Sequence, residues 1–395
     1  MRSKARRGYS DGVRASGLIA VGSGPAGLNA ASAFRARHPR VPVTILAADP
    51  AMPYEKPPLS KEFLCGRRSD VDLRSADWFA RHDLDLVLGI TVECLDVDNR
   101  EVVTRGGRRY PYWHCVLACG SSPVPLDVPG AGNALHLRSF ADAVALRMAA
   151  LSARSAVVIG GGLIGCEAAA CLASDGIATT LVAGEPVPLL RRFGVDAGER
   201  VAKILSDNGV RFIGAAEVAE IDDRGVTLAT GEAVDGDVVV AATGVRPDIS
   251  LAVEAGLRTD RGRIVTDEHM HTSVSDVYAA GDVALAYNVD ARRHVAAEHW
   301  RDAARQGMIA GETAAGYPRS WDDVPEFSCT IGDSTLKYRG WGTSYQHSRL
   351  IDHRDGFTVW YESDGEAVGV LSLNADEDYR QAAGLVRAHA HIDGS

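Results

Sequence analysis

Two clusters of glycine are the clearest chemical feature of this chain. The first reads Gly22-Ser23-Gly24-Pro25-Ala26-Gly27, and the second reads Gly160-Gly161-Gly162-Leu163-Ile164-Gly165. Glycines at this spacing allow a tight turn, bring backbone N–H groups close to a pyrophosphate, and let a helix pack closely on a strand. Each cluster therefore predicts a binding site for a dinucleotide.

The first cluster stands between the elements that such a site requires. Residues 18–21 form an apolar run typical of a buried parallel strand, and residues 28–34 are alanine-rich and periodic like a packed helix. A second strand over residues 43–46 leads to Asp49, an acid suited to hold a ribose hydroxyl. A glycine pattern alone would be weak evidence for dinucleotide binding. Its position in the order strand, turn, helix, strand and acid is specific for a dinucleotide-binding unit.

The second cluster has the same context, with strands predicted over residues 156–159 and 179–182 around an alanine-rich helix. Where an acid normally ends the second strand, this chain has Ala183, followed two residues later by Glu185. Glu185 could accept the 2′-hydroxyl of NADH, or the pair Arg191-Arg192 could meet the 2′-phosphate of NADPH. Gly165, the third glycine of the cluster, favours NADH as the coenzyme, and NADPH stays an alternative.

The last third of the chain adds a third set of elements. A strand over residues 276–280 ends in Gly281-Asp282, after a hairpin strand over 262–267, and a helix is predicted over 298–315. From residue 321 onward, alternating strand patterns end in a helix over 376–391. The predicted fold class is α/β, with two Rossmann-like dinucleotide-binding domains and a small α+β domain at the C-terminus.

Length and charge exclude several classes of protein. The 395 residues suggest two or three domains, and 42 basic against 52 acidic residues leave a net charge of −10, which argues against nucleic acid as a partner. No apolar run approaches the length of a membrane span, and the basic start lacks the apolar core of a secretory signal. We expect a cytoplasmic protein whose first 15 residues are a mobile tail.

The cysteines and histidines predict neither cross-links nor metal sites. Seven cysteines are scattered without a Cys-x-x-Cys pair, so we expect no disulfide framework and no zinc or iron–sulfur ligation. Cys166 and Cys171 are interpreted as small core residues of one helix. His269 with His271 and His389 with His391 lack partners at metal-ligand spacing, so we expect no bound metal.

A further segment carries a family resemblance, namely Pro53-Tyr54-Glu55-Lys56-Pro57-Pro58-Leu59-Ser60-Lys61. With the two glycine clusters, it makes the chain resemble FAD-dependent NAD(P)H:ferredoxin reductases that serve oxygenases, which have the glutathione-reductase fold. The resemblance covers residues 18–316 and continues more weakly to the end. The segment stands where disulfide reductases carry a Cys-x4-Cys pair. Without that dithiol, electrons must leave the flavin directly.

The resemblance implies an activity and a domain division. Hydride passes from NADH or NADPH to FAD, and single electrons then pass to an iron–sulfur ferredoxin that feeds an oxygenase or cytochrome P450. Residues 1–123 and 250–320 would form the FAD domain, 124–249 the NAD(P)H domain, and 321–395 the C-terminal domain. The protein would work as a monomer or a homodimer.

The resemblance also implies roles for individual residues. Lys61 would lie beside the flavin N5 and pair with Glu167, and these two are the expected catalytic residues. The expected FAD-binding residues are Gly22, Gly24, Pro25, Ala26, Gly27, Asp49, Lys61, Val92, Ala118, Gly120, Gly281, Asp282, Glu298, His299 and Trp300. The expected coenzyme-binding residues are Gly160, Gly162, Leu163, Ile164, Gly165, Glu185 and Gly244.

Two departures from the family pattern concern the flavin. An arginine that commonly follows the turn at Ala118-Cys119-Gly120 is replaced by Ser121 and Ser122, which removes one expected phosphate partner. Ser328 stands where many relatives place a tryptophan against the flavin, which would leave the flavin face more open.

Two other functions therefore remain open. An open flavin face would suit an NAD(P)H oxidase, or a reductase of a small acceptor such as oxygen or a quinone. The fold would also suit an NADH-sensing binding protein with little turnover, similar to apoptosis-inducing factor. If an acidic ferredoxin is the acceptor, the basic pair Arg292-Arg293 is a candidate docking patch.

Overall fold

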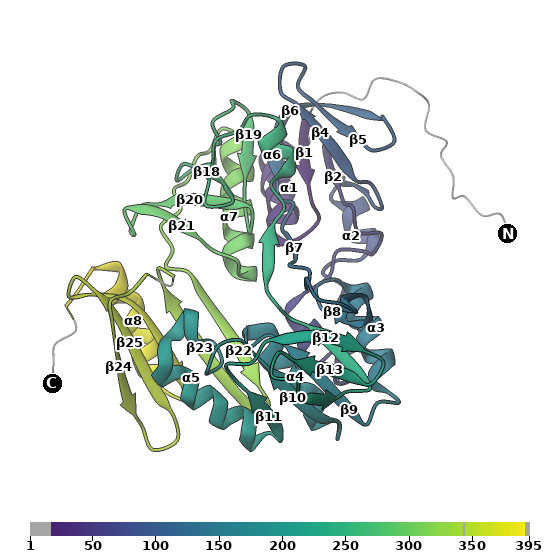
Figure 1. The fold of residues 1–395 in the computed structure, drawn as a ribbon. Helices are drawn as coiled ribbons and strands as arrows, with labels where there is room; N and C mark the ends of the chain where they lie inside the picture. The colour runs from purple at the N-terminus through teal and green to yellow at the C-terminus, as the bar shows by residue number, and fades with distance from the viewer. Residues whose placement is uncertain (1–16, 343, 392–395) are drawn as a thin grey trace.

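Two parallel sheets, each ending in one of the glycine loops, organise the chain in the computed structural model (Figure 1). The structure describes residues 17–342 and 344–391, so the expected mobile tail at residues 1–15 lies outside the described residues. The two sheets and a separate antiparallel sheet near the C-terminus confirm the predicted α/β class. Within the described part of the chain, no helix is long and apolar enough to cross a membrane.

The first sheet lies in the upper lobe of Figure 1 and has the strand order β3-β2-β1-β6, with β19 added beside β6. All five residues of β1 are buried, as expected for a parallel strand covered on both faces. A hairpin continues from β6, and a four-stranded sheet lies nearby. The strands of this lobe are β1 (Gly17–Val21), β2 (Val43–Leu46), β3 (Asp85–Val87), β4 (Val92–Asp96), β5 (Glu101–Thr104), β6 (Arg109–Leu117), β17 (Thr259–Asp260), β18 (Arg263–Thr266), β19 (Val277–Ala279), β20 (Ala284–Asn288) and β21 (Arg293–Ala296).

Helices α1 (Pro25–Arg37) and α7 (Trp300–Ala314) pack closely in this lobe. An added Cβ at Gly307 would lie 2.1 Å from the carbonyl oxygen of Ala26, and one at Gly311 would lie 2.2 Å from that of Ala30. Only glycine at these two positions permits this approach, and it brings the N-terminus of α7 to the first glycine loop. Shorter helices of the lobe are α2 (Ala76–Arg81) and α6 (Ser250–Glu254), and η1 (Pro57–Ser60) leads from it to the second lobe.

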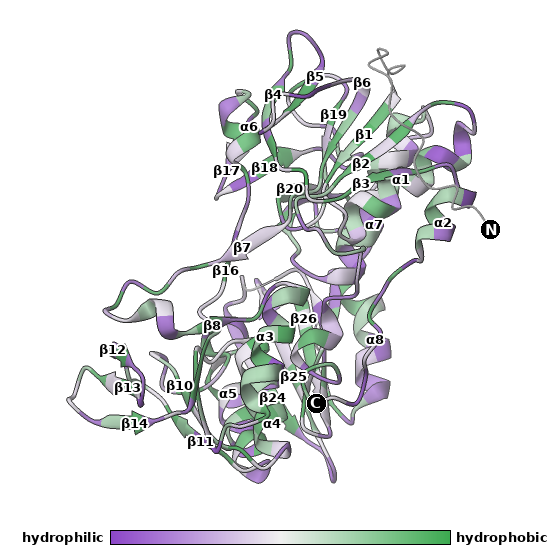
Figure 2. Cartoon of the chain, turned by 90° about the vertical axis from the view of Figure 1, so that its right-hand side faces the viewer, coloured by the Kyte–Doolittle hydropathy of each residue, from purple (hydrophilic) through white to green (hydrophobic). Residues whose placement is uncertain are grey.

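The second sheet forms the lower lobe, in the order β11-β10-β9-β15-β8 (Figure 1). Its strands are as apolar as those of the first sheet, as the green of β1 and β10 shows in Figure 2. The lobe contains β8 (Leu135–His136), β9 (Ser155–Ile159), β10 (Ala178–Val182), β11 (Val210–Ile213), β15 (Val238–Ala241), the small sheet β12 (Val218–Asp222), β13 (Gly225–Leu228) and β14 (Ala233–Asp235), and the helices η2 (Ala131–Asn133), α3 (Phe140–Ala150), α4 (Leu163–Ser174) and α5 (Leu190–Asp207).

The antiparallel pair β7 (Ser121–Pro123) and β16 (Val245–Pro247) connects the two lobes (Figure 2). A third unit completes the chain with the sheet order β22-β23-β26-β25-β24 and one helix. Its elements are β22 (Glu326–Ile331), β23 (Ser334–Gly340), β24 (His347–Asp352), β25 (Phe357–Ser363), β26 (Glu366–Leu373) and α8 (Asp376–Arg387). The terminal helix thus ends four residues before the predicted end at residue 391.

One expectation about the cysteines is wrong. Cys65 and Cys171 form a disulfide, although the scattered spacing predicted none. Cys171 is therefore not simply a core residue like Cys166, which is buried as a free thiol. The two partners are 106 residues apart in sequence, so only the tertiary structure brings them together.

Candidate functional site

The first glycine loop runs from the end of β1 into α1. Gly22 has a φ of 114°, and an added Cβ there would lie 2.1 Å from the carbonyl oxygen of Ala118. At Gly27 an added Cβ would lie 1.9 Å from the carbonyl oxygen of Gly22. The fold itself therefore requires these two glycines. At Gly24, in contrast, an added Cβ would meet no described atom within 4 Å, so the space in front of it is free for a ligand.

The second loop repeats this arrangement between β9 and α4. Gly160 has a φ of 118°, and an added Cβ there would lie 2.3 Å from the carbonyl oxygen of Ala242. At Gly165 an added Cβ would lie 2.0 Å from the carbonyl oxygen of Gly160. Gly162 again faces open space within the described part of the molecule. In each loop, two glycines are thus required by close contacts with backbone oxygens, and the glycine between them leaves space for a ligand.

A cavity of about 780 Å³ begins at the first loop and reaches the face of α4. This volume is typical of a cofactor pocket. The predicted site residues that line the cavity are Gly22, Gly24, Pro25, Ala26, Asp49, Lys61, Val92, Ala118, Gly120, Ile164, Glu167, Gly281, Asp282, Glu298, His299 and Trp300. Those outside its lining are Gly27, Gly160, Gly162, Leu163, Gly165, Glu185 and Gly244.

One end of the cavity is shaped by Asp49. Its carboxylate accepts hydrogen bonds from the Tyr54 hydroxyl at 2.7 Å and from the backbone N–H of Ala51 at 2.9 Å. Tyr54 in turn accepts a hydrogen bond from the backbone N–H of Phe140 at 3.0 Å. Burial and the Asp49 carboxylate raise the pKa of Tyr54, so it remains a hydroxyl that fixes Asp49 in place.

Lys61 and Glu167 meet at the boundary between the two lobes. The Lys61 ammonium donates to both carboxylate oxygens of Glu167 at 2.9 Å. The Ser60 hydroxyl donates to one of these oxygens at 2.6 Å, and the backbone N–H of Thr330 donates to the other at 3.1 Å. The Glu167 side chain is only 6% exposed. Three donor groups thus hold one buried carboxylate through four hydrogen bonds, and they come from the end of η1 and from the C-terminal unit.

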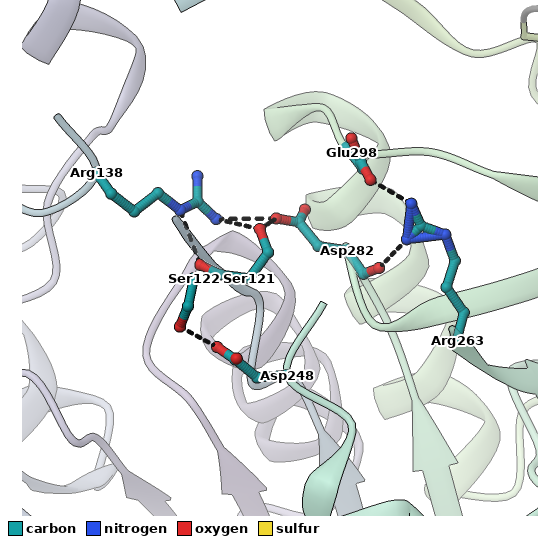
Figure 3. Close-up of polar contacts among 7 residues, drawn as sticks. All are labelled: Ser121, Ser122, Arg138, Asp248, Arg263, Asp282 and Glu298. Carbon is teal, nitrogen blue, oxygen red and sulfur yellow. Dashed lines mark hydrogen bonds and ion pairs between the residues drawn. The ribbon is translucent and has the colours of Figure 1, made fainter. Parts of the chain in front are cut away.

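Arg138 lines the cavity beside Ser121, the first residue after Gly120, where the sequence lacks the arginine expected from the family (Figure 3). Its guanidinium donates to the backbone oxygen of Ser121 at 2.9 Å, to the Ser121 hydroxyl at 2.8 Å and to the Asp282 carboxylate at 2.9 Å. The Ser121 hydroxyl donates to the same carboxylate at 2.6 Å. An arginine from a distant segment therefore supplies positive charge at this wall of the cavity.

Two further cations support this wall. Arg263 donates to the backbone oxygen of Asp282 at 2.8 Å and also binds the Glu298 carboxylate (Figure 3). Lys56 lines the cavity near Arg138 and Asp282, and burial together with the neighbouring Arg138 lowers its pKa to about 8. The cluster orients the carboxylates and leaves cationic groups facing the cavity.

An aromatic contact closes the side of the cavity near the C-terminal unit. The rings of His299 and Phe327 stack with their centroids 3.9 Å apart. The Arg192 guanidinium lies 4.5 Å from the centre of the Phe327 ring and donates to Nε2 of His299 at 2.6 Å. Burial and Arg192 hold the pKa of His299 well below its usual range, so the ring stays neutral. Ser328, next along β22, lines the cavity and is exposed.

Glu185 lies beyond the end of β10, on the side of the second glycine loop. Its carboxylate pairs with the Arg191 guanidinium at 2.6 Å. The Arg191 side chain is 89% exposed, whereas that of Glu185 is 24% exposed. The pair places an acid, rather than a free arginine, next to the strand that ends at the predicted ribose position.

Several residues that line the cavity or bind its carboxylates were not predicted as site residues. Tyr54 belongs to the segment that carries the resemblance, but its contact with Asp49 was not foreseen. Arg138 directly precedes the capping box of Ser139 and Asp142 at the start of α3, a pattern that marks a helix start but no ligand. Arg263 and Phe327 come from strands that nothing in the local sequence connects to the site.

Comparison with known proteins places this geometry in a family. The profile of the pyridine nucleotide-disulphide oxidoreductases matches residues 17–307. A rubredoxin-NAD(+) reductase of Pseudomonas putida is 30% identical over 354 residues, which cover 87% of this chain and 91% of the relative. A ferredoxin–NAD(P)(+) reductase of Sphingomonas sp is 31% identical over 401 residues, with coverage of 95% and 94%. The fold matches that of a reductase solved as a covalent putidaredoxin reductase–putidaredoxin complex, with a TM-score of 0.90, 26% identity and coverage of 96% and 95%.

Proposed function

This chain belongs to the pyridine nucleotide-disulphide oxidoreductase family, and we propose that it is a flavoprotein reductase that passes electrons from NADH or NADPH through FAD to a small iron protein. The acceptor is a ferredoxin or a rubredoxin that feeds an oxygenase or cytochrome P450. The observation that carries the proposal is one cavity that connects the first glycine loop to the Lys61–Glu167 pair on α4, the helix that begins at the second loop.

The residues of the cavity fit FAD. The space in front of Gly24 admits a pyrophosphate, and Lys56 and Arg138 supply positive charge in the cavity. Asp49, held by Tyr54, is placed to accept a ribose hydroxyl. When bound, FAD accepts a hydride from a reduced nicotinamide and releases electrons one at a time.

Lys61 and Glu167 act together as the expected catalytic pair. Glu167 accepts both hydrogen bonds of the ammonium and is itself fixed by Ser60 and Thr330, so Lys61 presents its charge to the cavity in one orientation. The pair also joins the lobe of the first loop to the helix that follows the second loop. It therefore positions a cation where the two dinucleotides would meet.

The sulfur chemistry of the site supports direct electron release. Among the described residues that line the cavity, Cys119 is the one cysteine, and it is a free thiol. Cys65 and Cys171 are outside the lining. Because no dithiol lines the cavity within the described residues, electrons pass to an external acceptor rather than to a disulfide beside the cofactor.

NADH is the coenzyme that the second loop favours. Glu185 can accept a ribose hydroxyl, and its pairing with Arg191 engages the cation that a 2′-phosphate would need. The protein works in the cytoplasm as a monomer or a homodimer.

The test is anaerobic mixing of the purified protein with NADH, and separately with NADPH, followed by the bleaching of flavin absorbance in a stopped-flow instrument. We expect fast bleaching by NADH, followed by electron transfer to an added ferredoxin or rubredoxin. Slow bleaching by both coenzymes would refute the proposal and favour a binding protein. Rapid oxygen consumption with no transfer to either iron protein would instead identify an oxidase.

A further inference from the structure

The disulfide between Cys65 and Cys171 joins the turn that carries Lys61 to helix α4 that carries Glu167. Cys65 lies in the turn that follows η1, and Cys171 lies on α4. Their Cα atoms are 5.8 Å apart, which is the usual separation for a disulfide. Cys65 follows Lys61 by four residues, and Cys171 follows Glu167 by four residues. The bridge and the ion pair are therefore two parallel links between the same two segments.

We propose that Cys65 and Cys171 form a reversible disulfide site, which a low-molecular-weight disulfide closes and a thiol opens, and that the closed bridge fixes the Lys61–Glu167 pair for hydride transfer. The effect on hydride transfer rests on the proposed function, whereas the formation of the bridge does not.

The surroundings of the two sulfurs suit thiol–disulfide exchange. Cys65 is half-buried and Cys171 is buried, so Cys65 is the thiol that an external disulfide can reach. The Arg147 guanidinium lies 3.1 Å from the position of a Cβ on the neighbouring Gly66. Arg67 donates to the Ser174 hydroxyl, which lies 4.0 Å from the Cys65 sulfur. A carboxylate oxygen of Asp175 lies within 4.8 Å of both sulfurs, so charges of both signs surround the pair, and the accessibility of Cys65 is what suits it to exchange.

The exchange balances with one small-molecule disulfide. The Cys65 thiolate attacks a sulfur of the disulfide, forms a mixed disulfide and releases one thiolate. Cys171 then loses its proton and attacks the Cys65 sulfur of the mixed disulfide, which releases the second thiolate. Overall, two protein thiols are oxidised to one disulfide, and one external disulfide is reduced to two thiols. A thiol in excess drives the same steps in reverse.

The bridge affects the ion pair through the backbone of Lys61. The sulfur of Cys171 lies 3.5 Å from the backbone oxygen of Lys61, so the bridged sulfur packs directly against the residue that provides the ammonium. When the bridge is open, the ion pair and the buried side chains of Phe63 and Leu64, which share a hydrophobic core with α4, still hold the turn at residues 61–66, but the covalent link at Cys65 is lost. We therefore expect Lys61 to be less well positioned in the reduced protein.

The distribution of the other cysteines favours a reversible bridge over a structural staple. Cys94, Cys115, Cys119, Cys166 and Cys329 are free thiols. A secreted protein stabilised by disulfides normally pairs most of its cysteines, whereas an isolated bridge among free thiols is typical of a redox-responsive pair.

Formation of the bridge is tested on the FAD-loaded protein with oxidised and reduced glutathione as probes. After equilibration in a chelator, free thiols are blocked and the protein is digested without reduction, and the fragments are identified by mass. We expect a cross-linked peptide that contains Cys65 and Cys171 in excess oxidised glutathione, and its loss under native conditions in excess reduced glutathione. Absence of that peptide, or its persistence until the protein is denatured, would overturn the proposal.

The effect on the site is measured as the rate of flavin bleaching by NADH in the oxidised and reduced forms. We expect the reduced wild type and Cys65→Ser to bleach three- to tenfold more slowly than the oxidised wild type, with FAD still bound. The matched control is Cys94→Ser, which removes an exposed free thiol and should keep the redox response of the wild type. Equal rates in both redox forms would overturn the effect on the ion pair, whereas the absence of bleaching in any form would instead refute the proposed function.

Discussion

Replacement of Glu167 by glutamine tests the central pair most directly. The substitution preserves shape but removes the charge that binds Lys61. One carboxylate oxygen accepts from Lys61 and Thr330, and the other accepts from Lys61 and Ser60. The backbone N–H of Thr330 can only donate a hydrogen bond, whereas the Ser60 hydroxyl can donate or accept one. The NH2 group of the new glutamine therefore faces Ser60, and its oxygen faces Thr330. Lys61 then keeps one neutral acceptor in place of two charged ones.

The magnitude follows from this change in hydrogen bonding. A hydrogen bond that involves a charged group contributes about 1.5–3 kcal/mol, and the ammonium of Lys61, which stays charged, loses one of its two such bonds. The hold on Lys61 therefore weakens by about 2 kcal/mol. If the productive position of Lys61 depends fully on its hydrogen bonds to residue 167, this loss slows flavin bleaching by NADH by up to about 30-fold, because 1.36 kcal/mol corresponds to a factor of ten.

The assay is anaerobic stopped-flow bleaching of the FAD-loaded Glu167→Gln variant at saturating NADH. The matched control is Glu312→Gln on α7, where a carboxylate that is 11% exposed pairs with Arg37 and Arg319 outside the cavity. We expect the control to bleach at the wild-type rate. A wild-type rate in Glu167→Gln would refute the reasoning, and so would a loss of FAD that accounts for the whole decrease.

Three other predictions concern the loops, the coenzyme and the buried acid of α7. Gly24→Val should fold but lose FAD, and Gly162→Val should keep FAD but lose NADH, because each valine would fold without a clash and fill the space that the dinucleotide needs. The absorbance of the purified protein measures bound FAD, and a coenzyme titration measures NADH binding. Misfolding of both variants would contradict this prediction. Glu185→Gln should free Arg191 and raise kcat/KM for NADPH relative to NADH by about tenfold, as measured by steady-state kinetics; an unchanged ratio would remove Glu185 from the ribose site. Burial and the nearby Glu326 carboxylate raise the pKa of Asp302 to about 7. Between about pH 4 and pH 7, the folded protein therefore keeps a proton on Asp302 that the unfolded chain has released. The free energy of unfolding consequently falls as the pH rises through this range. Asp302→Asn should therefore melt at a higher temperature than the wild type at pH 8 but not at pH 5, and equal melting at both values would contradict this assignment.

The sequence alone identified the elements in which local pattern and chemistry agree. The strands at residues 18–21 and 43–46 appear as β1 and β2, within one residue of their predicted bounds. The helix predicted at residues 28–34 begins earlier, at Pro25, because proline at the first helical position needs no N–H partner. The glycine loops are predictable because their spacing is fixed by the tight turn from strand to helix and by the room that a pyrophosphate needs.

The α/β class could be predicted for the same reason. Parallel strands that are buried on both faces are continuous apolar runs, and the connecting helices are alanine-rich where they pack closely. The segment at residues 53–61 indicated the family and the two residues of the ion pair. The hydrogen bonds of that pair with Ser60 and Thr330, however, join three segments of the chain and leave no signal in any one of them.

Only the tertiary structure decided which distant residues share the site. Arg138 takes over the wall beside Asp282 because the chain returns there after crossing from one lobe to the other through β7. The bridge between Cys65 and Cys171 was missed because cysteine spacing reports only local motifs. A disulfide or an ion pair depends on the distance between side chains in space, and that distance is set by the packing of whole lobes rather than by positions in the sequence.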